Sequence, residues 1–262
     1  MRRAVWGIPL LLVLSACEQP DAAALPESPR RIVDLSPTLR PQSPKDQWGS
    51  ALTAAYEFDD STTFSHWVSR EPIYGMFSEV SLNTHIGPHA DAPLHLIEDG
   101  KSIGEMPVDR FFGRARVVDV RTKGRDQPVQ REDLEDLDIR ADEIVILVGS
   151  YAPPTGPEAL PSYPYLSEGA AEYLAGIPVS AIVTDAPSLG SFRRYGALME
   201  ESPDPAHVVP EHLAFLSREI PVIEGIVNAD ELIGEDYVLF AGFPLKLGGV
   251  EAGVMRAVAL VY

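Results

Sequence analysis

Cysteine and basic residues are both scarce in this chain of 262 residues. Its one cysteine, Cys17, excludes an intrachain disulfide and a zinc site built from several cysteines. It has 21 lysines and arginines against 39 aspartates and glutamates, which gives a net charge of −18. Such an acidic excess opposes association with nucleic acid and with anionic lipid headgroups. We therefore expect no nucleic acid partner.

The apolar run that opens the chain, 4–14, is too short for a permanent membrane helix, which needs ~20 residues. It follows a basic start and ends in small residues before Cys17, as is typical of a secretory signal. The sequence Leu-Ser-Ala-Cys at this point resembles a bacterial lipobox, which implies cleavage before Cys17 and lipidation of its thiol. The alternative is a plain secretory signal with an incidental cysteine.

These features predict three parts of the chain. Residues 1–16 would be a lipoprotein signal peptide, and 17–30, rich in Ala, Pro and Glu, a flexible tether. Residues 31–262 would form one folded domain, since no internal linker is visible. The protein would then be lipid-anchored on the periplasmic side of a bacterial cell envelope, in contact with the membrane only through Cys17.

Short apolar and β-branched runs predict more strands than helices, and the two types only partly alternate. This favours a mixed α/β domain. The run 143–149 is apolar at both odd and even positions, which indicates a strand covered on both faces, and 79–82 alternates like a half-buried strand. We expect the other strands at 31–35, 115–120, 179–184, 220–227, 237–241 and 254–262, short helices at 131–137, 167–174 and 210–219, and an irregular or helical piece at 103–112 closed by Gly113.

Aromatic residues concentrate between positions 41 and 77. Either they form a wall or lid over a pocket for a flat substrate, or they fill a β-rich core. The sequence leaves both open for Trp48, Tyr56, Phe58, Phe64, Trp67, Tyr74 and Phe77.

Three histidines and an aspartate crowd into one segment, His85-Ile86-Gly87-Pro88-His89-Ala90-Asp91-Ala92-Pro93-Leu94-His95. A straight strand would hold the first two histidines roughly 13 Å apart at ~3.3 Å per residue, too far to share one ion. The glycine and the two prolines let the chain curl and exclude a regular helix. Imidazoles and a carboxylate converging in such a turn are typical ligands of Zn²⁺ or Mn²⁺. The candidate ligands here are His85, His89, Asp91 and His95.

Two distant residues are the best further ligand candidates. Glu224 lies inside the apolar run 221–227, where a carboxylate is costly unless it is paired or bound to a metal. His212 lies near the expected start of a helix. From the residues alone, a metal role and a purely structural role both remain open for each.

The spacing His85-x-Gly-x-His89-x-Asp91-x-Pro93-x-His95 resembles the signature of the metal-dependent cyclase family, which includes bacterial kynurenine formamidase (arylformamidase) and isatin hydrolase. The similarity extends to Asp99-Gly100, Ile103-Gly104 and Pro107, to Thr184-Asp185-Ala186-Pro187-Ser188, and to His212 followed twelve residues later by Glu224. It covers about 31–262. Within the family, the formamidases look most similar.

The resemblance implies a swivelling β/β/α domain with two divalent metal ions, Zn²⁺ or Mn²⁺, usually assembled as a homodimer or larger oligomer. His85, His89 and Asp91 would hold the first ion, and Asp91, His212 and Glu224 the second, with Asp91 bridging. His95 would be the general acid and base. The implied reaction is hydrolysis of the amide C–N bond of an aryl formamide such as N-formylkynurenine, or of a cyclic amide.

The chain departs from the family pattern in three places. Pro88 and Leu213 stand where many members have Thr or Ala and a second histidine, and a Trp-Pro-Gly-Asp-like stretch is not recognisable between Trp67 and Phe77. Two rival functions follow. One is a lipoprotein that binds metal or a small molecule without turnover, and the other is a structural envelope protein whose histidines stabilise a loop.

Overall fold

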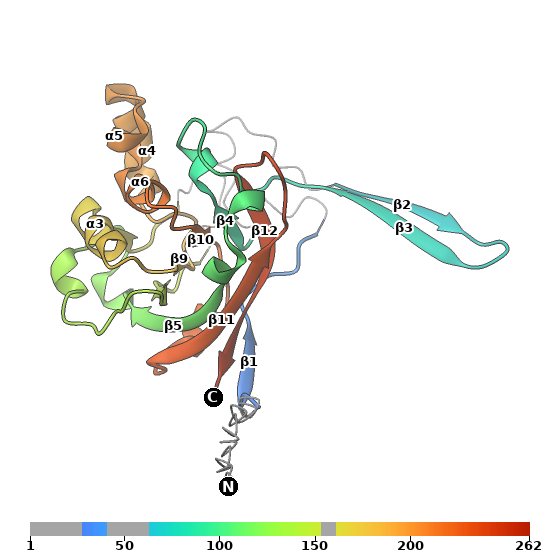
Figure 1. Ribbon diagram of the computed structural model, residues 1–262, viewed down its shortest axis with the longest axis horizontal. Helices are drawn as coiled ribbons and strands as arrows, with labels where there is room; N and C mark the ends of the chain where they lie inside the picture. The colour runs from blue at the N-terminus through green and yellow to red at the C-terminus, as the bar shows by residue number, and fades with distance from the viewer. Residues whose placement is uncertain (1–27, 41–62, 153–160) are drawn as a thin grey trace, which may run out of the picture.

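The computed structural model describes residues 28–40, 63–152 and 161–262. Its centre is an eight-stranded mixed sheet in the order β1-β12-β11-β5-β7-β9-β10-β4 (Figure 1). The predicted mixed α/β class is confirmed. The strands are β1 (Arg31–Asp34), β4 (His89–Asp91), β5 (Phe112–Asp119), β7 (Ile144–Val148), β9 (Ala181–Thr184), β10 (Val222–Glu224), β11 (Tyr237–Pro244) and β12 (Ala252–Val261).

The sheet closes on itself because β12 pairs with strands at both ends of the row. Residues 252–254 of β12 pair with β4 at one end of the row, and residues 258–261 pair with β1 at the other. Residues 255–260 pair with β11, the neighbour of β12 inside the row. Strands β5, β7, β9 and β10 run parallel, whereas β4, β11 and β12 join antiparallel. This barrel-like closure places β4 between β10 and β12.

The core has two layers, one inside the closed sheet and one between the sheet and the helices. In β7, Ile144, Ile146 and Val148 face the first layer, and Val145 and Leu147 face the second. Successive side chains of a strand point to opposite faces, so a strand covered on both sides is apolar at every position. The prediction that 143–149 is such a strand is confirmed.

The helices form a group on one side of the sheet (Figure 1). Ser167 caps the first of them by accepting a hydrogen bond from the Ala170 N–H, as its side chain predicts. A long helix after position 191 was not predicted. The α-helices are α3 (Glu168–Gly176), α4 (Phe192–Glu201), α5 (Pro205–Val208) and α6 (Pro210–Leu216).

Several predicted elements are shorter or of another type. The 131–137 segment forms only a 3₁₀ turn with bends, and 103–112 holds two 3₁₀ turns. Gly113 does not end that piece, because it already lies within β5. The 3₁₀ turns are η1 (Pro93–His95), η2 (Ile103–Glu105), η3 (Val108–Phe111), η4 (Arg121–Lys123), η5 (Arg131–Asp133) and η6 (Ala229–Leu232), and β6 (Pro128–Val129) pairs with β8 (Tyr165–Leu166).

A two-stranded arm projects away from the sheet (Figure 1). It consists of β2 (Thr63–Ser69) and β3 (Gly75–Ser81), paired antiparallel. The strand predicted at 79–82 is present as the end of β3, but its predicted half-burial was wrong, because β3 is exposed along almost its whole length. Phe64, Trp67, Tyr74 and Phe77 lie on this arm rather than in the core, while Trp48, Tyr56 and Phe58 lie outside the described residues.

The predicted signal peptide, 1–16, and Cys17 also lie outside the described residues, as does most of the predicted tether. Within the part of the chain that the structure describes, none of the helices has both the length and the apolar character needed to cross a bilayer.

Candidate active site

Strand β4 supplies the central pair of side chains, His89 and Asp91. Two residues apart on one strand, they point to the same face, while Ala90 and Ala92 between and after them face the core. His89 lies directly opposite Glu224 of β10 in the antiparallel ladder. Side chains directly opposite each other in such a ladder are neighbours. The strand register therefore brings three predicted ligands together.

His85 joins them because the chain curls before β4. Gly87 has a φ of 58°, a conformation that glycine adopts at little cost, and the turn folds the His85 ring back onto Asp91. His85 Nδ1 lies 3.1 Å from Asp91 Oδ1. The Gly87 carbonyl lies 2.9 Å from His89 Nδ1, which leaves His89 Nε2 facing Asp91 Oδ1 at 3.5 Å. The predicted curl is confirmed.

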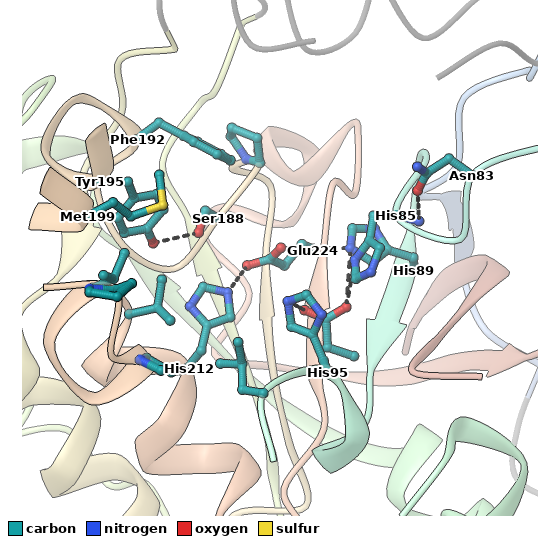
Figure 2. Close-up of a pocket in the computed structure, with 17 residues that line it drawn as sticks. Asn83, His85, His89, His95, Ser188, Phe192, Tyr195, Met199, His212 and Glu224 are labelled. Carbon is teal, nitrogen blue, oxygen red and sulfur yellow. Dashed lines mark hydrogen bonds and ion pairs between the residues drawn. The ribbon is translucent and has the colours of Figure 1, made fainter. Parts of the chain in front are cut away.

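His212 arrives from helix α6, on the other side of Glu224 (Figure 2). Its Nε2 lies 3.0 Å from Glu224 Oε1, which also accepts a hydrogen bond from the Leu189 N–H. Both side chains are buried. The costly buried carboxylate that the sequence pointed to thus has an imidazole and a backbone donor as partners.

His95 stands at the edge of the same cluster. It ends the 3₁₀ turn η1, and its Nε2 lies 4.0 Å from Asp91 Oδ2. Its ring centroid is 4.6 Å from that of His85. At 31% side-chain exposure, against 1% for Asp91, it is open enough to reach a molecule in the cavity.

The donor atoms form two groups that share one residue. Those of His85, His89 and Asp91 lie within 4.8 Å of one another, and so do those of Asp91, His212 and Glu224. Asp91 Oδ1 is buried and makes no hydrogen bond with the described residues. Two compact sets of imidazole nitrogens and carboxylate oxygens with an unsatisfied shared oxygen fit divalent cations such as Zn²⁺ or Mn²⁺.

The electrostatics follow from burial and from this crowding. Burial disfavours charge at every group, but the pKa of Asp91 is held well below its usual range by His85, His95 and His89. Against the effect of burial, Asp91 and Glu251 raise the pKa of His85 to about 10. Burial lowers the pKa of His95, so this imidazole is neutral at neutral pH.

An apolar wall that was not predicted faces the cluster. The cavity has a volume of about 550 Å³, and helix α4 contributes Phe192, Tyr195 and Met199 to its lining. These residues recur at positions i, i+3 and i+7, the spacing of one helix face, so the signal was present in the sequence. None of the predicted aromatic residues on the arm lines this cavity.

The segment Thr184-Asp185-Ala186-Pro187-Ser188 connects the cavity to the sheet. Pro187 and Ser188 line the cavity. Asp185 points elsewhere and accepts hydrogen bonds from the backbone N–H groups of Gly149 and Tyr151, at 3.0 and 3.2 Å. It therefore joins the ends of two neighbouring parallel strands, β7 and β9.

Two further carboxylates flank the histidines. Glu251 Oε1 lies 3.2 Å from His85 Nε2 and accepts a hydrogen bond from the Thr84 hydroxyl at 2.7 Å. Glu211 lies beside His212 and is buried. Neither was predicted: Glu251 comes from a segment far from His85 in sequence, and Glu211, although it directly precedes His212, belongs to no motif that was recognised.

The closed mixed sheet carries two groups of histidine and carboxylate side chains, and both groups line a cavity with an apolar wall. This arrangement defines a class of α/β protein suited to bind metal ions and a small molecule. The sequence model of the family described as "Putative cyclase" matches residues 33–191. The chain belongs to this cyclase family, as the resemblance implied.

The relatives carry related names. Kynurenine formamidase of Erythrobacter litoralis is 30% identical over 232 residues, 88% of this chain and 94% of that protein. Kynurenine formamidase of Delftia acidovorans is 31% identical over 240 residues, 87% of this chain and 97% of that protein. Isatin hydrolase A from Labrenzia aggregata, solved with benzyl benzoate, has a TM-score of 0.69 at 21% identity, covering 88% of this chain and 93% of that one, and so shares the fold.

Proposed function

We propose that this chain is a metal-dependent hydrolase that cleaves the amide C–N bond of an aryl formamide or of a cyclic amide. The observation that carries the proposal is the pair of ligand groups sharing Asp91 at one end of a cavity walled by apolar side chains. The names of the relatives support it, because kynurenine formamidase and isatin hydrolase denote enzymes acting on a linear and a cyclic amide.

Two divalent ions, Zn²⁺ or Mn²⁺, would complete the site. His85, His89 and Asp91 would hold one, and Asp91, His212 and Glu224 the other. When bound, such ions lower the pKa of water towards ~7 and polarise a carbonyl oxygen. The fit of the two donor sets and the unsatisfied Asp91 Oδ1 support this assignment.

His95 would carry the proton. It is neutral because burial lowers its pKa, so it can accept a proton from water as the water oxygen attacks the carbonyl carbon. It then donates that proton to the leaving nitrogen as the C–N bond breaks. Its position at the cavity edge, 4.0 Å from Asp91 Oδ2, lets one nitrogen face the reacting group.

The wall of α4 would select an aromatic substrate. Phe192 and Met199 offer flat and adaptable apolar surface in the cavity. Aromatic rings bury large apolar areas on such surfaces. We therefore propose an aromatic amide as the small-molecule substrate, held with its carbonyl towards the proposed metal site and its ring towards α4.

Metal analysis and a substrate screen test the proposal. Protein purified without added ions should contain Zn²⁺ or Mn²⁺ at close to two ions per chain, and it should hydrolyse members of a panel of aryl formamides, isatins and lactones. His95→Asn should retain both ions and lose turnover by a factor of ~10²–10⁴. Its metal content is the internal control for folding.

Three results would contradict the proposal. Protein without bound metal would favour a structural role for the histidines. Metal without turnover of any compound in the panel would favour a binding protein. Unchanged turnover in His95→Asn would remove His95 from the reaction.

We also propose that the protein is lipid-anchored through Cys17 in a bacterial cell envelope and assembles with a second copy of itself. The lipobox-like sequence supports the first proposal. The projecting arm of β2 and β3, with its exposed apolar side chains, supports the second.

A further inference from the structure

A buried chain of polar groups runs from the cavity wall to His212. The Tyr195 hydroxyl of α4 donates a hydrogen bond to Glu211 Oε1 at 2.6 Å and lies 2.9 Å from the Ser188 hydroxyl oxygen (Figure 2 shows the Tyr195–Ser188 contact). Glu211 Oε1 in turn lies 3.7 Å from His212 Nδ1. None of these contacts has a part in the reaction described above.

Glu211 is buried, which is energetically unfavourable for a carboxylate side chain. It is only 5% exposed, and an ionised carboxylate away from water is unfavourable unless its partners compensate. The backbone also makes room for it: a Cβ on Gly190 would lie 1.5 Å from Glu211 Oε1 and 2.3 Å from the Tyr195 hydroxyl. The local fold therefore accommodates this one carboxylate closely.

His212 has a buried ring nitrogen that lacks a hydrogen-bond partner among the described residues. Its Nε2 faces Glu224, whereas its Nδ1 is buried and makes no hydrogen bond with any described residue. Glu211 Oε1 faces this nitrogen, and a shift of about 0.5 Å would bring it within hydrogen-bonding distance. Histidines that bind metals almost always donate their other ring N–H to a carboxylate, a carbonyl or water, which fixes the tautomer and the ring orientation.

We propose that Glu211 is a positioning residue for His212. Its carboxylate accepts a hydrogen bond from the Nδ1–H group, so that Nε2 faces the ion that Asp91 and Glu224 would also hold, and Glu211 is itself held by Tyr195. The inference rests on the proposed metal site and extends it. Because Tyr195 also lines the cavity, the same contact joins the substrate wall on α4 to the ligand on α6.

Titration of the metal-free full chain with Co²⁺, without any substrate, tests this role. The measurements are affinity in competition with a chelator, the visible Co²⁺ spectrum, and the unfolding midpoint of the metal-free protein. Glu211→Gln keeps the size of the side chain and removes its charge. Glu132→Gln makes the same change at an exposed site and is the matched control. Tyr195→Phe removes only the hydroxyl that holds Glu211.

In Glu211→Gln, one of two Co²⁺ ions should bind 10–100-fold more weakly, with a changed spectrum for that ion only. Tyr195→Phe should move affinity in the same direction by a smaller factor, and Glu132→Gln should match the parent. The metal-free unfolding midpoint should stay at the parent value in Glu132→Gln and should not fall in Glu211→Gln. It should fall in Tyr195→Phe, because the buried Glu211 carboxylate loses its hydrogen-bond donor.

Two results for Glu211→Gln would overturn the role. One is Co²⁺ binding and a spectrum identical to those of the parent, with the parent still binding two ions. The other is an equal loss of affinity for both Co²⁺ ions together with a lower unfolding midpoint of the metal-free protein. That combination would indicate a structural role. A parent chain that binds no Co²⁺ would overturn the metal site and this inference together.

Discussion

Asp185 shows how one side chain of this fold can set a pH dependence. Its carboxylate is buried, and burial raises its pKa from 3.8 to about 6 despite hydrogen bonds from the backbone N–H groups of Gly149 and Tyr151. The unfolded chain releases this proton at lower pH than the folded chain does. Ionising the buried Asp185 therefore lowers the free energy of unfolding. This loss is absent below about pH 3.8, grows between pH 3.8 and 6, and is complete above pH 6.

Asp185→Asn should remove this dependence. A rise of the pKa from 3.8 to about 6 corresponds to about 3 kcal/mol. The difference in free energy of unfolding between variant and parent should thus shift by up to about 3 kcal/mol in favour of the variant between pH 4 and pH 7. Chemical denaturation of the metal-free protein at several pH values measures it.

Asp136→Asn, at an exposed position, is the control and should show no such shift. A parallel pH dependence in parent and Asp185→Asn would show that Asp185 titrates as it does in the unfolded chain.

Individual residues of the site could be predicted where the sequence concentrates them. The cluster from His85 to His95 is local, and Glu224 interrupts an apolar run, so both stand out. Glu251 does not, because only folding brings it beside His85. Glu211 directly precedes His212 in the sequence, but an acidic residue next to a histidine does not show that its side chain is buried and turned towards the imidazole.

At the scale of elements, the β2–β3 arm is the feature that most needs a partner. An isolated two-stranded hairpin is marginal in water, yet this one exposes apolar side chains on both faces. Trp67 and Phe77 lie opposite each other across the ladder and are 54% and 66% exposed. The arm leads through Asn83, which lines the cavity, into His85.

Replacing Trp67 and Phe77 together by serine should weaken self-association at least tenfold. Each buried aromatic contributes about 1.5–3 kcal/mol to association, and 1.4 kcal/mol is a factor of ten. Sedimentation or light scattering across a concentration series measures the change. Ile32 and Tyr262, exposed to a similar degree on the main sheet, replaced by serine together, are the matched control.

If the arm variant and the parent associate equally, or if both are monomers at all concentrations, the arm is not a self-association surface.

Strands covered on both faces were easier to predict than the arm or α4. In β7 every residue is apolar, and this alone indicates that both faces of the strand are buried. At the end of β3, the alternation of polar Glu79 and Ser81 with apolar Val80 and Leu82 cannot tell a half-buried strand from an exposed one, because the pattern does not say whether anything covers the apolar face. Helix α4 carried a readable face, but two prolines and several charges around it resemble a loop.

For the molecule as a whole, family and fold class were predictable, but the closure of the sheet was not. The pairing of β12 with β4 joins residues that are far apart in sequence, unlike its pairing with the preceding strand β11. Such long-range pairing depends on the packing of all the intervening strands. No local pattern records it, although it decides which side chains surround Asp91.

The location of the molecule is tested by Cys17→Ser. If the thiol carries the lipid anchor, fractionation of cells that express the parent should place the protein in the membrane fraction. The variant should either appear in the soluble fraction or retain its uncleaved signal peptide. Mass spectrometry of the parent should find the lipid on Cys17. A parent found only in soluble fractions would show that the N-terminus is a plain secretory signal.

The place of Asp91 in both ligand groups makes the two positions interdependent. If both groups hold a cation as proposed, the first to bind would fix the rotamer of the shared carboxylate and add positive charge beside the second position. A protein with one ion would then be a different chemical species from one with two, rather than an enzyme at half strength. The supply of trace elements around the cell would then act on the population of these species and not simply on how much protein is active.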